Sequence, residues 1–573
     1  MLHKPQTKDR APRSRTGGQI IVDCLVAHGV DTVFCVPGES FLAVLDALRD
    51  VQDKIRVIVG RHEASVANMA EAYGKLTGRP GICVFTRGPG SSQAAIGLYT
   101  ATQDCTPLIM FVGQVNRDKI GREASQEADY KRYFAETSKW VTEIVDPAHA
   151  SEQISRAFHV AVNGRPGPVV VSIPEDMQNE VCTVSPPAPY KLAGAAPSAE
   201  ALDDLKAMLD GAERPLLILG GGGWSDESVA DIRRFAETFK LPVVTGFRRQ
   251  DLVDNEHPNY AGNLGLGTSP AALRMVRDAD VLLVVGERLG DMTTQGYTLI
   301  EFPRPRQSLI HVHAGPEELG LLYETDLPIN ATAREFAKAA ASLSSEPVND
   351  RSDWIAKGHD DYMAFSTPPA EREGDVDSRH VIADLSARLP KDATITNGAG
   401  LYTANVHRYH RYRTYTSQLA PMSGAMGYGF PAAIAAKIVH PERTVVCYAG
   451  DGCFQMAIPE LATAVQYNIA VIVVVIDNAS LGSIRLHQEL HFPGRVVSTD
   501  LVNPDFVALA KAYGAYAEKV ERTEDFEAAF ARAEASGRPA LLTFRQDVVQ
   551  DVSQALGSLA SRGKPVTADV DAV

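Results

Sequence analysis

One segment near the carboxyl end of the chain constrains its fold more than any other. A short apolar run at 444–449 stops at Gly450-Asp451-Gly452, a helical pattern follows, and an unbroken, mostly β-branched run fills 469–476. Such a run is typical of a strand covered on both faces of a parallel sheet, so the segment predicts a strand–helix–strand unit. Neighbouring parallel strands end at the same edge, about 4.8 Å apart. Asp451 and Asn478, each just past a strand end, are therefore expected to reach one point.

The residue types at this edge indicate a metal and a diphosphate. A carboxylate from Asp451 and an amide oxygen from Asn478 suit Mg²⁺, which prefers hard oxygen ligands and keeps water and substrate phosphates in its shell. Gly450 and Gly452 allow the backbone to approach a diphosphate closely, and the following helix N-terminus offers free N–H groups. The alternative interpretation is an ordinary turn with a solvated Asp451.

Composition and charge limit the class of protein and its partners. The chain has 573 residues, enough for about three or four domains of ordinary size. Its hydrophobic content of 45% and charged content of 22% are typical of a globular protein. The net charge of −15 argues against a nucleic-acid partner, which needs basic surfaces. No apolar run approaches the ~20 residues that span a bilayer, so no membrane association is expected.

The cysteines and the two ends of the chain point to a cytoplasmic protein. Seven cysteines, an odd number, do not suggest a disulfide framework. The sequence contains no C-x-x-C pair, so a zinc site is not expected. His62-Glu63 begins like a zinc-protease motif, but Val66 stands where the second histidine belongs. Residues 1–17 lack the apolar core of a signal peptide and are predicted to form a disordered tail, with a transit peptide as the alternative. Residues 550–573 are predicted to form a polar carboxyl-terminal tail.

Strands and helices alternate in three blocks, predicted as domains at 18–186, 198–345 and 354–549. Pro-rich and polar stretches between the blocks indicate linkers. This alternation predicts an α/β fold with three parallel-sheet domains. The first and third blocks also share a helix, an apolar run and a Gly-x-Gly sequence in the same order, which suggests two related domains on either side of a different one.

Several motifs together resemble one family, the thiamine diphosphate-dependent decarboxylases and carboligases, and in particular acetolactate synthase large subunits. In the first block they are Val36-Pro-Gly-Glu39, Arg61-His-Glu63, Ala70-Glu-Ala-Tyr73, Thr77-Gly-Arg-Pro-Gly81, Gly88-Pro-Gly90 and Gln126-Glu127; in the third they are Gly424-Ala-Met-Gly-Tyr-Gly-Phe-Pro431, Gly450-Asp-Gly452 and Asn503-Pro-Asp-Phe506. The resemblance implies a pyrimidine-binding, a central and a diphosphate-binding domain. It also implies a homodimer or homotetramer in which the first block of one chain meets the third block of its neighbour.

The resemblance assigns catalytic roles to Glu63 and Met426. A Glu63 carboxylate hydrogen-bonded to the aminopyrimidine would favour the imino tautomer, whose nitrogen can remove the thiazolium C2 proton. Met426 would lie beneath the cofactor and bring its two rings together, which is catalysis by positioning. The alternatives are that Glu63 is a capping or surface residue at the start of the helix at 64–76 and that Met426 fills the core.

Binding roles follow from the same resemblance. The pyrimidine would lie near Gly38, Glu39, Pro89 and Gln93, and the rest of the cofactor near Gly398, Ala399, Gly400, Gly424, Met426, Gly450, Gly452, Cys453, Leu481 and Gly482. Asp451, Asn478 and the Ser480 carbonyl oxygen would bind Mg²⁺.

The expected substrate contacts depart from acetolactate synthases. Gln126 matches a catalytic glutamine that polarises a carbonyl there, but Ser125 stands before it where those enzymes carry Phe. Ser483 and His487 occupy positions of a Met and a Trp that shape the acceptor pocket. Arg485 and His487 suit an anionic or polar substrate. Gln126 could instead be an ordinary surface residue, and one of Arg485 and His487 could simply face solvent on a helix.

A flavin is the remaining cofactor that the resemblance raises. Acetolactate synthases hold FAD in the central domain, where this chain has Gly220-Gly-Gly-Gly223 after a predicted strand and Gly286-Glu-Arg-Leu-Gly-Asp-Met292 further on. Ser225 stands where the dinucleotide fingerprint requires its third glycine. FAD, a different nucleotide and an empty central domain all stay open.

The predicted function is C–C bond formation or cleavage on a 2-oxo acid such as pyruvate, with thiamine diphosphate and Mg²⁺. A 2-oxo acid decarboxylase, a C–C hydrolase and a 2-hydroxyacyl lyase share its first steps and are alternatives. A non-catalytic regulatory homologue is the alternative from another class; the presence of Glu63, Asp451 and Asn478 argues against it. A flavin- or nicotinamide-dependent oxidoreductase would need the complete fingerprint.

Overall fold

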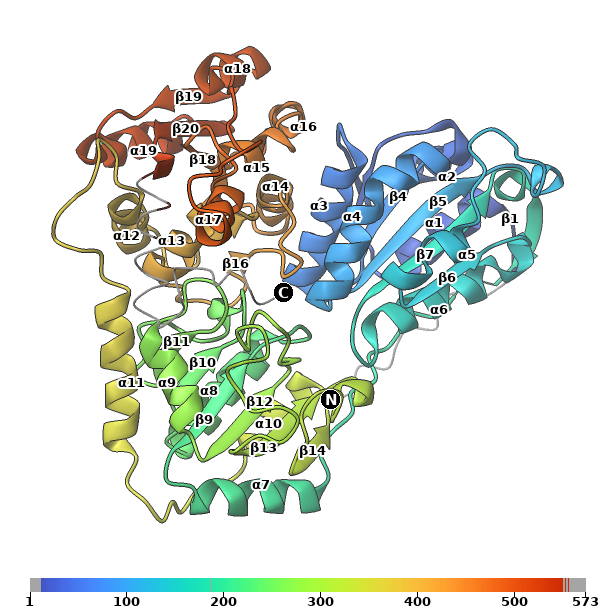
Figure 1. Cartoon of the computed structure of the whole chain (residues 1–573). Coiled ribbons are helices and arrows are strands. Elements are labelled where there is room, and N and C mark those ends of the chain that lie inside the picture. The colour runs from blue at the N-terminus through green and yellow to red at the C-terminus, as the bar shows by residue number, and fades with distance from the viewer. Residues whose placement is uncertain (1–11, 186, 550–551, 553–554, 556–573) are drawn as a thin grey trace. The chain divides into compact units, whose positions relative to one another are not determined.

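A computed structural model describes residues 12–185, 187–549, 552 and 555 of the chain. The chain divides into two compact units, the first ending at Ala193 and the second beginning at Gly194. The first unit is drawn in blue to cyan in Figure 1, and the second runs from green to red. Each unit is described by itself.

The first unit is built on a six-stranded parallel sheet in the order β3-β2-β4-β5-β7-β6. Its strands are β2 (Thr32–Cys35), β3 (Arg56–Val59), β4 (Gly81–Phe85), β5 (Leu108–Gln114), β6 (Trp140–Glu143) and β7 (Pro168–Pro174). Its helices are α1 (Gly17–Ala27), α2 (Leu42–Arg49), α3 (Glu63–Thr77), α4 (Gly88–Asp104), α5 (Tyr130–Tyr133) and α6 (Ala150–Val162). Strands β4, β5 and β7 are buried along their whole length, which their apolar, β-branched residues favour.

Helices α3 and α4 place functional side chains at one edge of this sheet. Helix α3 is almost completely buried, and Gly97 of α4 leaves no room for a side chain because a Cβ there would lie 2.3 Å from the Ala67 Cβ. The two helices therefore pack closely. Each begins just after a strand ends, at Glu63 and at Gly88, so their first turns lie at the carboxyl edge of the sheet.

The amino-terminal segment differs from its prediction in part. Residues Arg13–Thr16, assigned to a disordered tail from the sequence, form strand β1, which pairs antiparallel with β8 (Val181–Val184). Thr16 then caps α1 through a capping box with Gln19, so Gly17 already belongs to the helix. The sequence pattern missed this strand because it is polar and held by a distant partner. The remainder of the predicted tail, 1–11, lies outside the described residues.

The central sheet in the second unit has six parallel strands in the order β11-β10-β9-β12-β13-β14. Its strands are β9 (Pro215–Leu219), β10 (Val243–Thr245), β11 (Tyr260–Asn263), β12 (Val281–Val285), β13 (Ser308–His313) and β14 (Leu327–Asn330). Its helices are α7 (Ala199–Gly211), α8 (Asp226–Thr238), α9 (Pro270–Asp278), α10 (Ala333–Ala340) and α11 (Ser352–Phe365). The chain starts in the middle of the sheet, builds one side and then the other, as in a doubly wound dinucleotide-binding fold.

The third sheet, also in the second unit, has the order β16-β15-β17-β18-β20-β19 and is likewise parallel. Its strands are β15 (Thr394–Asn397), β16 (Gln418–Leu419), β17 (Val445–Gly450), β18 (Ile472–Asp477), β19 (Tyr516–Lys519) and β20 (Ala540–Arg545). Its helices are α12 (Ser378–Arg388), α13 (Tyr402–Tyr409), α14 (Gly429–Val439), α15 (Asp451–Gln455), α16 (Glu460–Gln466), α17 (Gly482–His491), α18 (Phe506–Tyr513) and α19 (Phe526–Ala535). The predicted strand–helix–strand unit is β17, α15–α16 and β18.

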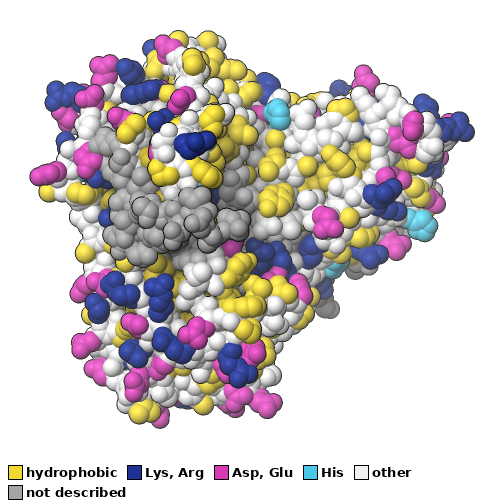
Figure 2. All heavy atoms as spheres, in the orientation of Figure 1, with side chains coloured by type: hydrophobic (Ala, Val, Ile, Leu, Met, Phe, Trp, Pro, Cys, Tyr) yellow, Lys and Arg dark blue, Asp and Glu magenta, His cyan; other side chains and the backbone are white. Residues whose placement is uncertain are grey.

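The predicted fold class, α/β with three parallel-sheet domains, is confirmed. Among the described residues, no helix is long and apolar enough to cross a membrane. On the face drawn in Figure 2, basic and acidic side chains are interspersed over the central domain, and this face therefore offers no continuous basic surface there. Of the predicted carboxyl-terminal tail, 550–573, only residues 552 and 555 are described.

Candidate active site

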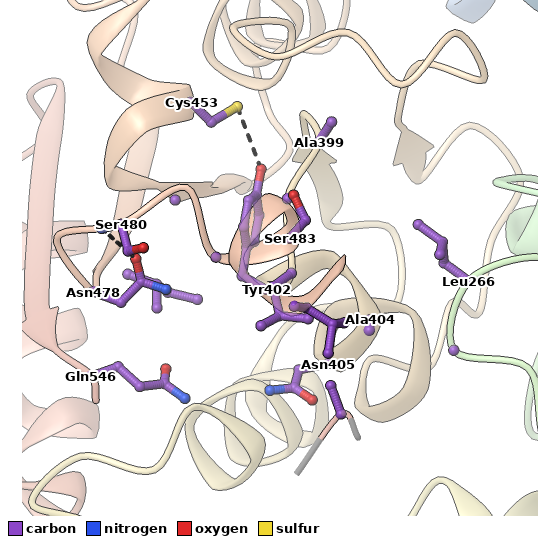
Figure 3. A pocket seen from close by; sticks show the side chains of 18 of the residues that line it. Leu266, Ala399, Tyr402, Ala404, Asn405, Cys453, Asn478, Ser480, Ser483 and Gln546 are labelled. Atoms are coloured by element: carbon purple, nitrogen blue, oxygen red, sulfur yellow. Dashed lines mark hydrogen bonds between the residues drawn. The ribbon is translucent and has the colours of Figure 1, made fainter. Parts of the chain in front are cut away.

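A cavity of about 590 Å³ lies at the carboxyl edge of the third sheet. Strands β15, β17 and β18 are neighbours, so the loops that follow them meet there. The predicted residues that line this cavity are Ala399, Gly400, Gly424, Met426, Gly450, Asp451, Gly452, Cys453, Asn478, Ser480, Leu481 and Gly482. Figure 3 shows Asn478 and Ser480 together on one side of it. Chain segments separated by some 80 residues in sequence are thus brought to one site by the strand order.

Asp451 is held by a hydrogen-bond network that the sequence motif does not reveal. Asn503 Nδ2 donates to Asp451 Oδ2 at 2.6 Å and to Asp477 Oδ1 at 2.7 Å. The Gln455 side-chain amide donates in turn to Asn503 Oδ1 at 2.8 Å. The Gly452 N–H donates to the other oxygen, Asp451 Oδ1, at 2.8 Å. The carboxylate orientation is therefore fixed before any cation binds.

The electrostatics of Asp451 favour a bound cation. The residue is only 2% exposed. Burial raises the pKa of Asp451 and the nearby Asp477 adds to that rise, whereas the hydrogen bonds from Asn503 and Gly452 lower it. A desolvated carboxylate next to a second carboxylate gains from a positive charge. Among the described residues, no group of three or more His, Cys, Asp or Glu side chains is arranged to hold a metal.

Asn478 and Ser480 form the other wall of the candidate metal site. The Ser480 N–H donates to Asn478 Oδ1 at 3.1 Å, and Ala479 between them has a φ of 49°. The Ser480 hydroxyl donates to the Thr499 carbonyl at 3.0 Å and is thereby tied to the following loop. This tight turn bends the chain directly after β18 and holds the two residues beside the cavity.

Buried groups support the glycine loop after β15. A Cβ at Gly398 would lie 2.4 Å from Cys453 Sγ, so only glycine fits there. The Tyr402 hydroxyl accepts from the Gly398 N–H at 3.1 Å and donates to Cys453 Sγ at 3.6 Å, the contact drawn in Figure 3. The Gly427 N–H donates to the same sulfur at 3.2 Å. Gly398 itself lies behind the cavity wall formed by its neighbours Ala399 and Gly400.

Met426 lies where the cavity meets the core. It is partly buried and packs against the hydrophobic core of the third domain. A Cβ at Gly452 would lie 3.7 Å from the Met426 Cε, so the thioether reaches the loop that follows β17. An unbranched, adaptable side chain at this place can support a flat ring from below.

The predicted substrate residues Arg485 and His487 do not line the cavity. Arg485 Nη1 pairs with Asp500 Oδ1 at 3.0 Å, and His487 is exposed on α17. Neither is among the residues that line the cavity, whereas Ser483, Ile484 and Leu486 of the same helix are.

In the first unit, Glu63 is the first residue of α3. The helix is capped by the side chain of His62, which accepts from the Ala64 N–H at 3.2 Å, so Glu63 is not needed as a cap. The Glu63 carboxylate accepts no hydrogen bond from any residue that the structure describes. A Cβ at Gly90 would lie 3.2 Å from Glu63 Oε1. The carboxylate thus faces the start of α4 and is available to a ligand.

Gln126 lies at the same sheet edge, against the other end of the Gly88-Pro89-Gly90 segment. A Cβ at Gly88 would lie 2.9 Å from the Gln126 carbonyl oxygen. Arg87 Nε donates to Gln126 Oε1 at 3.2 Å, and Arg87 Nη1 pairs with Glu175 at 3.2 Å. Because arginine only donates, the amide must turn its oxygen toward Arg87, which leaves its NH₂ group to donate elsewhere.

The predicted pyrimidine-binding residues occupy a loop and the first turns of a helix at this edge. Gly38 and Glu39 follow β2, and a Cβ at Gly38 would meet the Thr86 side chain at 2.5 Å. Pro89 and Gln93 are exposed in the first turns of α4. All four lie in the same unit as Glu63.

The comparisons with known proteins agree with this geometry. Models of the amino-terminal, central and carboxyl-terminal domains of thiamine pyrophosphate (thiamine diphosphate) enzymes match residues 15–133, 202–340 and 398–544. The chain is 32% identical to a probable acetolactate synthase large subunit of Methanocaldococcus jannaschii, over 96% of this chain and 94% of that protein. The chain belongs to the thiamine diphosphate enzyme family. It is also 31% identical to the acetolactate synthase isozyme 2 large subunit of Escherichia coli, over 94% of this chain and 96% of that protein.

Family membership identifies the cavity as lying in the carboxyl-terminal cofactor-binding domain and Glu63 as lying in the amino-terminal one. The predicted family is confirmed, and the chain is a thiamine diphosphate enzyme with carboligases among its relatives. Two functional candidates were missed in the sequence analysis. Asn503 was named only as part of a matching motif, and Arg87 was not named. The position of Arg87 directly before a Gly-x-Gly turn is the signal that could have found it.

Proposed function

We propose that this thiamine diphosphate enzyme is an acetolactate synthase-like carboligase that acts on a 2-oxo acid such as pyruvate. The observation that carries the proposal is the pairing of Asp451 and Asn478 at two adjacent strand ends of the cavity, in a chain about 31% identical to acetolactate synthases over nearly its whole length.

Mg²⁺ is part of the proposal because the donor set fits it. Asp451, Asn478 and the Ser480 carbonyl supply one carboxylate and neutral oxygens, and Mg²⁺ is usually held by one or two carboxylates together with phosphate oxygens. The buried Asp451 carboxylate, oriented by Asn503 and the Gly452 N–H, is a ready first ligand. The glycine loops on either side leave room for the cofactor diphosphate.

The chain's own residues would act at two places. Thiamine diphosphate supplies, when bound, a nucleophilic carbon that adds to the carbonyl of a 2-oxo acid. Glu63 would hold a proton at the aminopyrimidine N1′, since no described residue donates a hydrogen bond to its carboxylate. Gln126 would donate from its NH₂ group to a developing oxyanion, while Arg87 holds the amide in that orientation. Arg485 and His487 are proposed to act at the substrate end, which would require movement of α17.

We also propose a homodimer or homotetramer, as the family resemblance implies. Glu63 and Gln126 belong to the amino-terminal domain, and the cavity belongs to the carboxyl-terminal one. In the proposed assembly, the amino-terminal domain of one subunit completes the cavity of its neighbour. The exposed Pro89 and Gln93 would then contact the pyrimidine. FAD is not part of the proposed function.

A product assay tests the function. The protein, loaded with thiamine diphosphate and Mg²⁺, is incubated with pyruvate alone and with a panel of other 2-oxo acids. Acetolactate as the main product from pyruvate supports the proposal. Acetaldehyde without acetolactate would identify a decarboxylase, and no turnover of any 2-oxo acid would favour a lyase, a hydrolase or the non-catalytic alternative.

A further inference from the structure

The central domain has the architecture of a dinucleotide site. The order in which the strands are added reverses between β9 and β12, and ligands of open parallel sheets bind in the crevice that this reversal leaves at the carboxyl ends of the strands. Gly220 and Gly221 follow β9, and Gly286 and Glu287 follow β12. In a dinucleotide-binding domain, the first of these loops brings its backbone close to the pyrophosphate.

In this chain the close approach is made by a side chain. A Cβ at Gly220 would lie 2.1 Å from Glu287 Oε2, and a Cβ at Gly246, which follows β10, would lie 2.0 Å from the same oxygen. The Glu287 side chain therefore starts at the end of β12, crosses the end of β9 and reaches the end of β10. The glycines at 220 and 246 are required by this carboxylate.

Burial and a hydrogen bond fix the position of the Glu287 side chain. It is 3% exposed, and its Oε1 accepts from the Arg288 N–H at 3.1 Å. Burial raises the pKa of Glu287, and the nearby Arg288 opposes that rise. Oε2 is buried without a hydrogen-bond partner among the described residues, although it lies against the glycine loops. An anion at this position would lie against a carboxylate oxygen, which accepts hydrogen bonds and has none to donate.

Two further contacts hold the glycine loop after β9 in place. Trp224 is 2% exposed, and its indole Nε1 donates to the Gly220 carbonyl at 2.8 Å. The guanidinium of Arg249 donates to the Gly221 carbonyl. The two loops also touch, because a Cβ at Gly221 would lie 2.0 Å from the Gly286 carbonyl oxygen. The carbonyl groups of Gly220 and Gly221 are thus hydrogen-bonded within the domain.

We propose that the Glu287 side chain fills the place of a dinucleotide pyrophosphate at the β9–β12 switch point, so that the central domain excludes FAD. The domain then serves as a scaffold, and the enzyme works with thiamine diphosphate and Mg²⁺ alone. This inference concerns the central domain and does not depend on which 2-oxo acid is the substrate.

Flavin binding tests the proposal directly. The wild-type protein and two variants, Glu287→Ala and Glu287→Gln, are loaded with thiamine diphosphate and Mg²⁺, incubated with excess FAD and separated from free FAD by gel filtration. Bound flavin is measured by its visible absorption. Glu287→Gln is the matched control because it keeps the volume of the side chain and removes its charge. Thermal unfolding and cofactor titration of each protein verify the fold, and Glu287→Ser replaces Glu287→Ala should that variant not fold.

The expected result is a flavin-free wild type, a flavin-free Glu287→Gln protein and an FAD affinity at least about tenfold higher in Glu287→Ala. Stoichiometric flavin in the wild-type protein would overturn the proposal. So would an alanine or serine variant that binds no more FAD than wild type, because Glu287 would then not be the obstacle. Equal FAD binding by the Gln and Ala variants would assign exclusion to charge and contradict the filling of space. In all cases, thiamine diphosphate binding in the same samples reports on the proposed function separately.

Discussion

Asn503 Nδ2 lies 2.6 Å from Asp451 Oδ2, and this single amide group also bonds Asp477 Oδ1 at 2.7 Å. One NH₂ group thus holds two carboxylates side by side at the end of β17 and β18. It keeps Asp451, the proposed metal ligand, from turning away and reduces the repulsion between the two acids. Loss of a residue that orients a ligand in this way commonly weakens metal binding.

Replacing Asn503 by Ala is expected to weaken Mg²⁺-dependent cofactor binding by about 10–100-fold, the usual cost of losing a residue that orients a metal ligand. Gln455→Leu, which removes only the bond to Asn503 Oδ1, should weaken it in the same direction by less. Calorimetric titration of thiamine diphosphate at several Mg²⁺ concentrations measures both. An Asn503→Ala protein with wild-type Mg²⁺ dependence would show that Asp451 needs no such support.

Asp451→Asn should remove most of the Mg²⁺ dependence of cofactor binding while leaving the fold intact, because the amide keeps the shape of the side chain and loses the charge that binds the cation. The same titration measures this effect. Asp477→Asn is the matched control, since Asp477 shares Asn503 with Asp451 but is not a proposed ligand. Equal losses in both variants would mean that the metal is bound elsewhere.

Gln126→Ala is expected to lower turnover by roughly 100-fold with little change in cofactor affinity, because an oxyanion donor acts in the transition state. Arg87→Ala should lower turnover by less, since the amide stays but is free to rotate. Steady-state kinetics on pyruvate compare these variants with Arg122→Ala, an exposed residue of the same loop. Turnover in Gln126→Ala as high as in the control would remove Gln126 from the mechanism.

His487→Trp introduces the residue that the resemblance to acetolactate synthases predicts at this position, and it should change the ratio of rates among 2-oxo acids more than the affinity for thiamine diphosphate. His491→Trp, one turn further along α17 and also exposed, is the control. Competition between pairs of 2-oxo acids gives the ratio of kcat/KM values. A variant that loses cofactor affinity and keeps its substrate preference would show that His487 lies near the cofactor instead.

The sequence predicts the buried strands well because their apolar side chains report directly on burial. Strand β18 begins at Ile472, three residues into the run 469–476 that the sequence predicts as a strand. The edge strands β16 and β19 were not predicted from the sequence. β16 is only two residues long, and β19 carries Glu and Lys, so pairing with a neighbour rather than local composition creates them.

The site follows the same pattern. Asp451 and Asn478 can be predicted from the motif because strand ends in a parallel sheet meet at one edge. The bond from Asn503 to Asp451 joins residues 52 positions apart, and no local pattern contains it. Glu287 lies in a motif that resembles a flavin region, and only the structure reveals that its carboxylate extends to Gly246.

The central claim is that Glu63 activates bound thiamine diphosphate. The most direct measurement is the rate at which the C2 proton of the bound cofactor exchanges with deuterium from solvent, followed by NMR after rapid acid quenching. In Glu63→Gln the cofactor should still bind, and exchange should be slower than in wild type by about 10²–10⁴-fold, the usual contribution of a general acid–base group. Exchange in the variant at the wild-type rate, with the cofactor bound, would contradict the account.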